Sequence, residues 1–452
     1  MTLPEEEKTP ADVVAFNAYL NRTTGAAVSR AGQTGAIGND ALKGSADGFG
    51  VFAFHGNDDW LYAAGTQQPD FMYNQQVKWD NDPSHQVWTY SPLKYWPNET
   101  GSDAVSDNTD RLSFFAYAPY VAVMPETGEL TTVYTGNQRT TGITAMSNHH
   151  HQGDPWVQYV VSYDASNQVD LCWADVDGNT LNQKKHSIDD PVQLNFHHAL
   201  SAINVQIDAV IDALIPSSTG LHENTRIYMR SVTFEGFAES GALNLYNRVA
   251  GKPRWIGNYG QGLIGMDAVT IHDGRRDRHE GSGANANEWP TGLNPSIIQS
   301  GAYDVSSSPI STPTPGVTST AVNLFDVSHW VYVNPESPTS AEIEARDAAP
   351  LYVIPNGQPL RVTVAYDVET YDPSLKYQRL SDDQTYGSSV PNVISSWVRL
   401  GGDNLVLEAG KQYTIKLHLG MTSVKVDVVS VKAWEYGAIV DVTIPDEPPV
   451  SP

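Results

Sequence analysis

The amino-acid sequence predicts an all-β protein made of two β-sandwich domains in tandem, and three observations support this. Apolar and polar residues alternate with a period of two in many segments, as in strands that bury one face. Segments with helical spacing and a capping residue are scarce. The 452 residues exceed a typical domain of about 100–200 residues. An Asp-Asp-Pro step at residues 189–191 marks the boundary, so we predict domains at 1–190 and 191–452, each long enough for a sandwich.

The first predicted domain begins with a short apolar strand, Val13–Leu20, which is followed by chain rich in Gly, Ala and Thr. Within that chain, residues 31–47 are expected to be irregular. Later strands are expected where aromatic and β-branched residues gather, because these residues suit a half-buried pleated surface. Those segments are Phe49–Phe54, Leu112–Tyr117 and Trp156–Tyr163.

The second predicted domain alternates most regularly in Leu360–Glu369, and Arg226–Phe234 is a further strand. Residues 200–214 fit both a helical and a strand period, and their β-branched content favours a strand. The alternation that resumes at Val424 changes phase at Val429, which suggests a bulge or a change of buried face. A short helix is possible over Ser340–Arg346, because Thr339 and Glu342 fit a capping box.

Composition excludes several classes of protein. Asp and Glu number 52 against 27 Lys and Arg, so the net charge of −25 argues against nucleic acid as a partner. The sequence contains no run of 18 apolar residues, so it predicts no transmembrane helix. Met1–Glu7 has no positive or apolar export region, which leaves a cytosolic protein or one whose signal has been removed. The single cysteine, Cys172, excludes an internal disulfide and is expected to be a small buried apolar residue.

Two patterns resemble metal sites, but neither predicts one. His149, His150 and His151 are consecutive, and neighbours in a strand point to opposite faces, so a polar loop tip is favoured over a shared ion. The acidic turn at Asp175–Asn179 has its Gly at the fourth position of a calcium loop, whereas the EF-hand requires it at the sixth. The pair at residues 197–198 is expected to be structural. We therefore expect no metal and no cofactor.

Sequence signatures of catalysis are absent, including the nucleophile elbow, the phosphate loop and the metalloprotease helix. A non-enzymatic protein is therefore expected. A glycoside hydrolase stays open as a third class, because its two carboxylates are paired in space rather than in sequence. An aromatic cluster could stack sugars, although bracing of a core is favoured for such large rings. Its members are Trp79, Trp88, Tyr90, Tyr95 and Trp96.

Five stretches of the chain, taken in order, resemble the fimbrillin family of Bacteroidetes, which comprises the type V pilins and their Mfa-like relatives. Each stretch is a weak signal alone, and together they are fairly specific. They are Phe49–Phe54, Trp88–Pro97, Leu112–Pro119, Val192–Ile203 and Ala409–Lys425.

The resemblance implies two transthyretin-like β-sandwich domains and a non-enzymatic fimbrial subunit or fimbria-associated adhesin. It implies other pilin subunits as partners, with host or bacterial surface ligands as further possibilities. It also implies a lipoprotein precursor, a location in the fimbrium at the outer membrane, and attachment through a lipid anchor. The lipobox cysteine that such a precursor carries is missing near the start of this sequence. The alternative is a cell-surface carbohydrate-binding protein that uses the aromatic cluster.

The resemblance further implies assembly by strand exchange, in which a protease cuts after a basic residue and the first strand leaves. The removable strand is then Val13–Leu20, with Val13, Phe16 and Leu20 as its buried residues. Arg22 and Arg30 are the processing candidates, and Arg30 is preferred because Gly-rich chain follows it. The donor-strand candidate, which alternates and precedes an acidic Pro-rich tail, contains Ile439, Val440, Val442 and Ile444.

Overall fold

Strands make up nearly all of the regular structure of the chain. The computed structural model contains one helix in the part that it describes, α1 (Asn39–Gly44). No helix in that part is long and apolar enough to cross a membrane. The residues that the structure describes are 13–20, 39–63, 66–83, 86–97, 109–131, 141–161, 169–185, 190–209, 225–249, 252–256, 264–265, 269–273, 303–304, 322–323, 351–371, 374–375, 387–419 and 424–433.

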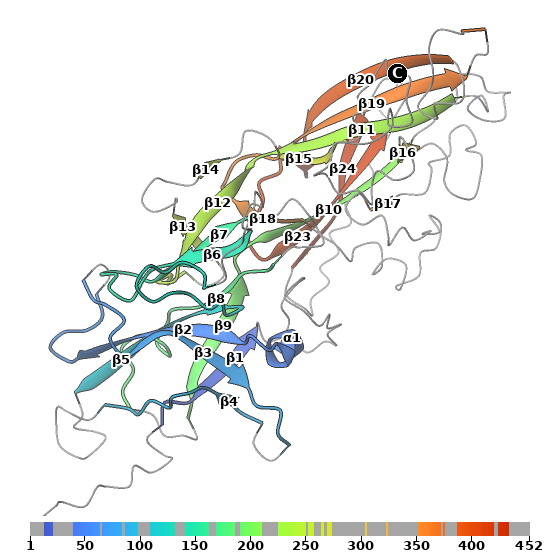
Figure 1. The fold of residues 1–452 in the computed structure, drawn as a ribbon. Coiled ribbons are helices and arrows are strands. Elements are labelled where there is room, and N and C mark those ends of the chain that lie inside the picture. Colours follow the sequence, from blue (N-terminus) through green and yellow to red (C-terminus); the bar gives the residue numbers. More distant parts are fainter. Residues whose placement is uncertain are drawn as a thin grey trace, which may run out of the picture.

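The first sheet has seven strands in the order β1-β9-β8-β5-β2-β3-β4, and it forms the lower end of the molecule in Figure 1. The strand β1 lies at the edge of this sheet and runs parallel to β9. All the other pairs of neighbouring strands in this sheet are antiparallel. The strands are β1 (Phe16–Leu20), β2 (Phe49–Asn57), β3 (Met72–Trp79), β4 (Trp88–Thr89), β5 (Asp110–Ala118), β8 (Cys172–Ala174) and β9 (Val192–His198).

The second sheet has ten strands and follows the order β24-β23-β10-β18-β12-β7-β6, with β13 and β14 pairing to β12 and β17 pairing to β10. Its strands are β6 (Gly142–Met146), β7 (Trp156–Val160), β10 (Ser201–Ala209), β12 (Phe237–Asn244), β13 (Arg254–Ile256), β14 (Ile264–Gly265), β17 (Val322–Asn323), β18 (Leu351–Pro355), β23 (Lys411–Leu419) and β24 (Val424–Ala433).

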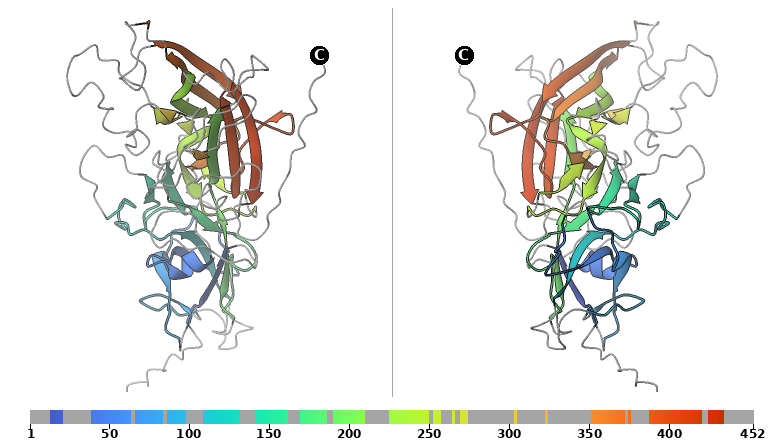
Figure 2. Two further views of the ribbon diagram at one scale, coloured as in Figure 1. Left: turned by 90° about the vertical axis from the view of Figure 1, so that its right-hand side faces the viewer. Right: turned by 90° about the vertical axis from the view of Figure 1, so that its left-hand side faces the viewer.

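A third sheet follows the order β15-β11-β19-β20, with β16 paired to β11, and its long strands lie at the upper end of the molecule in Figures 1 and 2. A two-stranded ribbon, β21-β22, completes the described strands. These strands are β11 (Thr225–Glu235), β15 (Val269–Asp273), β16 (Tyr303–Asp304), β19 (Arg361–Tyr371), β20 (Gly387–Trp397), β21 (Arg399–Leu400) and β22 (Asp403–Asn404).

The first sheet is buried on both faces, because side chains that alternate along its central strands enter two different hydrophobic clusters. Phe52 and Phe115 face the larger cluster, which continues through residues of the second and third sheets. Phe49 and Phe114 face a smaller cluster that includes the inward side chains of β1. This arrangement explains why every residue of β5 is buried.

Strand pairing crosses residue 190 in both directions. The strands β6 and β7 precede this position, yet β7 pairs with β12 of the second sheet. The strand β9 follows it, yet it pairs with β1 and β8 of the first sheet. The boundary between folding units at residue 190 stays a prediction.

Within the described residues the predicted strands are confirmed, including β10 in the stretch that fits two periods. The phase change in the last predicted strand is a bulge. Thr414 pairs with Ser430 and Ile415 with Val428, which leaves Val429 as the extra residue. The helix α1 lies in a stretch that was expected to be irregular, and its Leu42 is buried in the smaller cluster. The possible helix at Ser340–Arg346 lies outside the described residues.

Candidate functional site

The strand β1 lies at the edge of the first sheet, and β9 is its neighbour among the described strands. Its five residues pair in parallel with β9, from Phe16 opposite Val192 to Leu20 opposite Phe196. The amide of Val192 also donates a hydrogen bond to the carbonyl oxygen of Ala15 over 2.8 Å. An edge strand in this position can leave without breaking any other strand pair of the sheet.

The side chains of β1 alternate strictly between the core and the surface. Val14, Phe16, Ala18 and Leu20 are at most 5% exposed, and the residues between them are half-buried. The prediction that Val13 is one of the buried residues is wrong, because Val13 is half-buried and Val14 occupies the inward position. The sequence signal that identifies the buried face of this strand is the strict period of two that begins at Val14.

Phe16 fills a pocket of aromatic rings contributed by other elements. Its ring centroid lies 6.5 Å from that of Phe49 on β2, 5.5 Å from Phe114 on β5 and 5.7 Å from Tyr90. The contacts with Phe49 and Phe114 are edge-to-face, the arrangement that aromatic pairs prefer. The surface that β1 covers, called the groove below, is therefore apolar, and its central position takes a large side chain.

The beginning of β1 is fixed by a second segment of chain. The Val14 amide donates to the Lys94 carbonyl over 2.9 Å, and the Tyr90 hydroxyl donates to the Val14 carbonyl over 2.8 Å. Burial raises the pKa of Tyr90 to about 12, so its hydroxyl stays a donor at neutral pH. Sequence reasoning missed these two hydrogen bonds, which we call the latch, because only the fold brings Tyr90 to Val14.

Three rings of the aromatic cluster belong to the core around β1 rather than to a binding surface. Trp88, Tyr90 and Trp96 are no more than 7% exposed and lie in the smaller hydrophobic cluster. Trp79 is partly buried, and the Lys43 ammonium lies 4.3 Å above its ring. A sugar cannot stack on faces that are already covered, so the bracing role is confirmed for the three buried rings.

Two buried carboxylate–histidine pairs lock β8 to β9 next to the groove. His198 Nδ1 lies 2.7 Å from Asp170 Oδ2, and His197 Nε2 lies 2.5 Å from Asp175 Oδ2. Cys172 is fully buried as predicted, and burial together with Asp170 holds its pKa well above the usual value. The structural role expected for both histidines is confirmed. Sequence reasoning missed the acids, although they flank the strand that holds Cys172.

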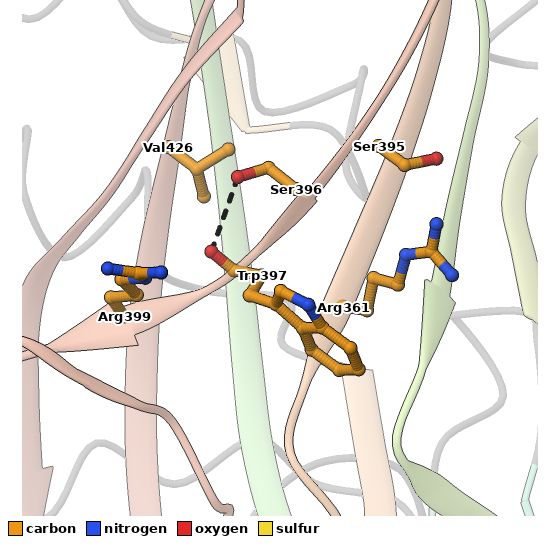
Figure 3. Close-up of a pocket in the computed structure, with 6 residues that line it drawn as sticks. All are labelled: Arg361, Ser395, Ser396, Trp397, Arg399 and Val426. Carbon is orange, nitrogen blue, oxygen red and sulfur yellow. Dashed lines mark hydrogen bonds between the residues drawn. The ribbon is translucent and has the colours of Figure 1, made fainter.

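A shallow hollow lies far from β1, between β20 and β24, and Figure 3 shows the six residues that line it. The Arg361 guanidinium lies 5.7 Å from the centre of the Trp397 ring and 3.5 Å from a carboxylate oxygen of Glu235. The described lining holds neither a carboxylate nor an imidazole for acid–base chemistry. It consists of Arg361, Ser395, Ser396, Trp397, Arg399 and Val426.

The structure describes only some of the segments that were predicted to take part in strand exchange. The removable strand lies in the groove as described above. The processing candidates Arg22 and Arg30 lie outside the described residues, and so does the donor-strand candidate Ile439–Ile444. Their roles stay predictions.

Comparison with known proteins gives a consistent picture. A family model described as fimbrillin-like matches residues 30–255. Fimbrium subunit Fim1C of Phocaeicola vulgatus is 28% identical over 247 residues, which are 53% of this chain and 55% of that protein. The chain thus matches only about half the length of this curated relative. The crystal structure of a fimbrial protein from Bacteroides vulgatus has a TM-score of 0.52 at 18% identity and covers 94% of this chain and 99% of its own, a likeness of fold.

Proposed function

This chain belongs to the fimbrillin-like family, and from that premise we propose that it is a structural fimbrial subunit, or a fimbria-associated adhesin, that assembles by β-strand exchange. The single observation that carries the proposal is β1, an edge strand whose three inward residues, together with Val14 just before it, are buried against an apolar surface.

Loss of β1 would create a surface that requires a new occupant. Val14, Phe16 and Leu20 each contribute roughly 1.5–3 kcal/mol by burial, or about 5–9 kcal/mol together. Their removal would expose the aromatic floor and would also leave the edge of β9 unpaired. An incoming strand satisfies both needs, because its backbone pairs with the edge and its alternate side chains fill the groove.

Proteolysis is the step that we propose for the release of β1. Arg22 and Arg30 follow the strand directly in the sequence, and a trypsin-like protease that cuts after either residue separates β1 from the rest of the chain. We prefer Arg30, since the Gly-rich sequence after it suits entry of a protease.

The donor proposed for the vacant groove is the segment at the other end of the sequence. Val440, Val442 and Ile444 have the same spacing of two residues as the inward positions of β1. Insertion of this segment into a neighbouring copy is a heterologous contact, which continues as an open filament rather than closing into a dimer. Other fimbrial subunits with an empty groove are partners of the same kind.

The proposal also includes two transthyretin-like sandwiches divided near residue 190, where the sequence has an Asp-Asp-Pro step. It further includes a location in the cell-surface fimbrium and an outer-membrane lipid anchor on the precursor, and the match to the fimbrillin-like family supports these two parts. The sugar-binding alternative is not favoured, because three rings on which it relied are buried.

Limited trypsin digestion followed by size-exclusion chromatography and electron microscopy tests the proposal. The cleaved chain should form filaments, whereas the Arg30→Ala variant should be cut more slowly and stay monomeric for longer. A chain truncated after Gly437 should be cut normally and stay monomeric. Cleaved protein that loses β1 and remains monomeric would contradict strand exchange, as would polymerisation of the truncated chain.

A further inference from the structure

Two histidines and one glutamate meet on the surface where two turns touch. His149 Nε2 and His150 Nε2 are 2.6 Å apart, and Glu126 Oε2 lies 3.5 Å from the first and 3.4 Å from the second. All three donor atoms therefore lie around one point. We propose that Glu126, His149 and His150 form a binding site for a divalent transition-metal ion such as Zn²⁺.

The local backbone permits this convergence. The sequence argument against a shared ion assumed that these histidines lie in a strand, where neighbours point to opposite faces. His149 and His150 instead occupy a turn between β6 and β7. The His150 amide donates a hydrogen bond to Asn148 Oδ1 over 3.1 Å, which closes the turn. In this turn both rings are directed toward Glu126.

The spacing of the three donor atoms suits one ion. Zinc binds imidazole nitrogen at about 2.0–2.1 Å and carboxylate oxygen at about 2.0–2.2 Å. Ligands at these distances around one ion are roughly 3–3.4 Å from each other when the angles are tetrahedral or octahedral. The distances from Glu126 Oε2 to the two imidazole nitrogens, 3.4 and 3.5 Å, lie at and just above the upper end of this range. The two imidazole nitrogens, now 2.6 Å apart, need to separate by about half an ångström.

The donor set selects the class of ion. Two imidazole nitrogens and one carboxylate suit Zn²⁺, Ni²⁺ or Cu²⁺, whereas Ca²⁺ and Mg²⁺ prefer oxygen ligands throughout. The side chains of Glu126 and His150 are 73% and 67% exposed, so an ion from solution can reach them. Three protein ligands also leave coordination positions for water.

The two turns are held together by the backbone rather than by the proposed ligands. The His149 amide donates to the Pro125 carbonyl over 3.0 Å, and the Met146 amide donates to the Gly128 carbonyl over 2.9 Å. Gly128 has a φ of +77°, and a Cβ there would lie 1.9 Å from the Met146 carbonyl oxygen. Such a scaffold places the ligands before an ion arrives, which lowers the entropic cost of binding.

In the absence of an ion, a hydrogen bond between the two imidazole rings would explain the short distance between their Nε2 atoms. One neutral imidazole would donate its N–H to the lone pair of the other, which requires opposite tautomers. The site proposed here shares no residue with β1 or with the hydrophobic cluster beneath it, so its test is independent of strand exchange.

Isothermal titration of the untagged full chain with ZnCl₂ tests the site. We expect one tight site per chain. The zinc affinity should fall roughly 10- to 100-fold or more in His150→Ala and in Glu126→Gln, since loss of a residue that only hydrogen-bonds to a metal ligand already has that effect. His151→Ala is the matched control, because its ring contacts the Asp154 carbonyl at 3.2 Å and lies outside the cluster. Millimolar Mg²⁺ or Ca²⁺ should not displace the zinc.

X-ray absorption at the zinc edge supplies a second readout, and it should show two imidazole ligands in the wild type and one in His150→Ala. Thermal unfolding of the metal-free variants should match that of the wild type, because both altered side chains are exposed. Three outcomes would overturn the proposal: no zinc uptake by the wild type, unchanged affinity in both ligand variants, or an equal loss of affinity in His151→Ala.

Discussion

Replacement of Phe16 by alanine should release β1 from its groove. Phe16 is 4% exposed and contacts three aromatic rings, and truncation of such a buried ring costs about 3–5 kcal/mol. This loss is about half of the 5–9 kcal/mol attributed to burial of β1 as a whole. Because each 1.4 kcal/mol is a factor of ten, local opening of β1 should become roughly 100- to 4,000-fold more frequent.

Hydrogen exchange of the peptide containing residues 13–20, followed by mass spectrometry, measures this opening directly. Tyr19→Ala is the matched control, because Tyr19 is an aromatic residue of the same strand on the half-buried outer face. Phe16→Ala should speed exchange by the stated factor, and Tyr19→Ala should have a much smaller effect. Equal exchange rates in the two variants would refute the claim that the groove retains β1 through its inward side chains.

Three further predictions concern the elements around the groove. Tyr90→Phe leaves the Val14 carbonyl without its side-chain donor, so urea denaturation should show a loss of about 1 kcal/mol, and no loss would contradict the latch. Burial raises the pKa of both Tyr90 and Tyr413 to about 12 from an unfolded value near 10, so their contribution to stability is complete below pH 10 and disappears as the pH rises to 12. Thermal unfolding across that range should show falling midpoints, and a flat profile would count against it. Asp170→Asn breaks a fully buried pair with His198 and should cost about 3–5 kcal/mol in urea denaturation. Wild-type stability of this variant would show that the pair does not stabilise the fold.

Local pattern was sufficient to predict most of the fold. The period of two identified the strands, and the phase change at Val429 identified a bulge, because both depend on residues that are adjacent in sequence. The parallel pairing of β1 with β9 was beyond such reasoning, since about 170 residues separate the two strands and no local signal fixes a distant partner. The six-residue helix α1 was too short to show a helical period.

The candidate site was predicted in part for the same reason. The apolar strand at residues 13–20 was visible as a local run, but its inward face was assigned through Val13 rather than Val14. Tyr90 and Phe114 contact β1 only because the sheet brings them there. The meeting of Glu126 with two histidines likewise depends on two turns that are separated in sequence and joined by backbone hydrogen bonds.

The most direct test of strand exchange is a cryo-electron microscopy map of the filament formed after cleavage. The account predicts that β1 is absent and that residues 439–444 of one subunit lie beside β9 of the next, with Val440, Val442 and Ile444 directed into the groove. A filament in which β1 still occupies the groove, or in which another segment fills it, would contradict the account.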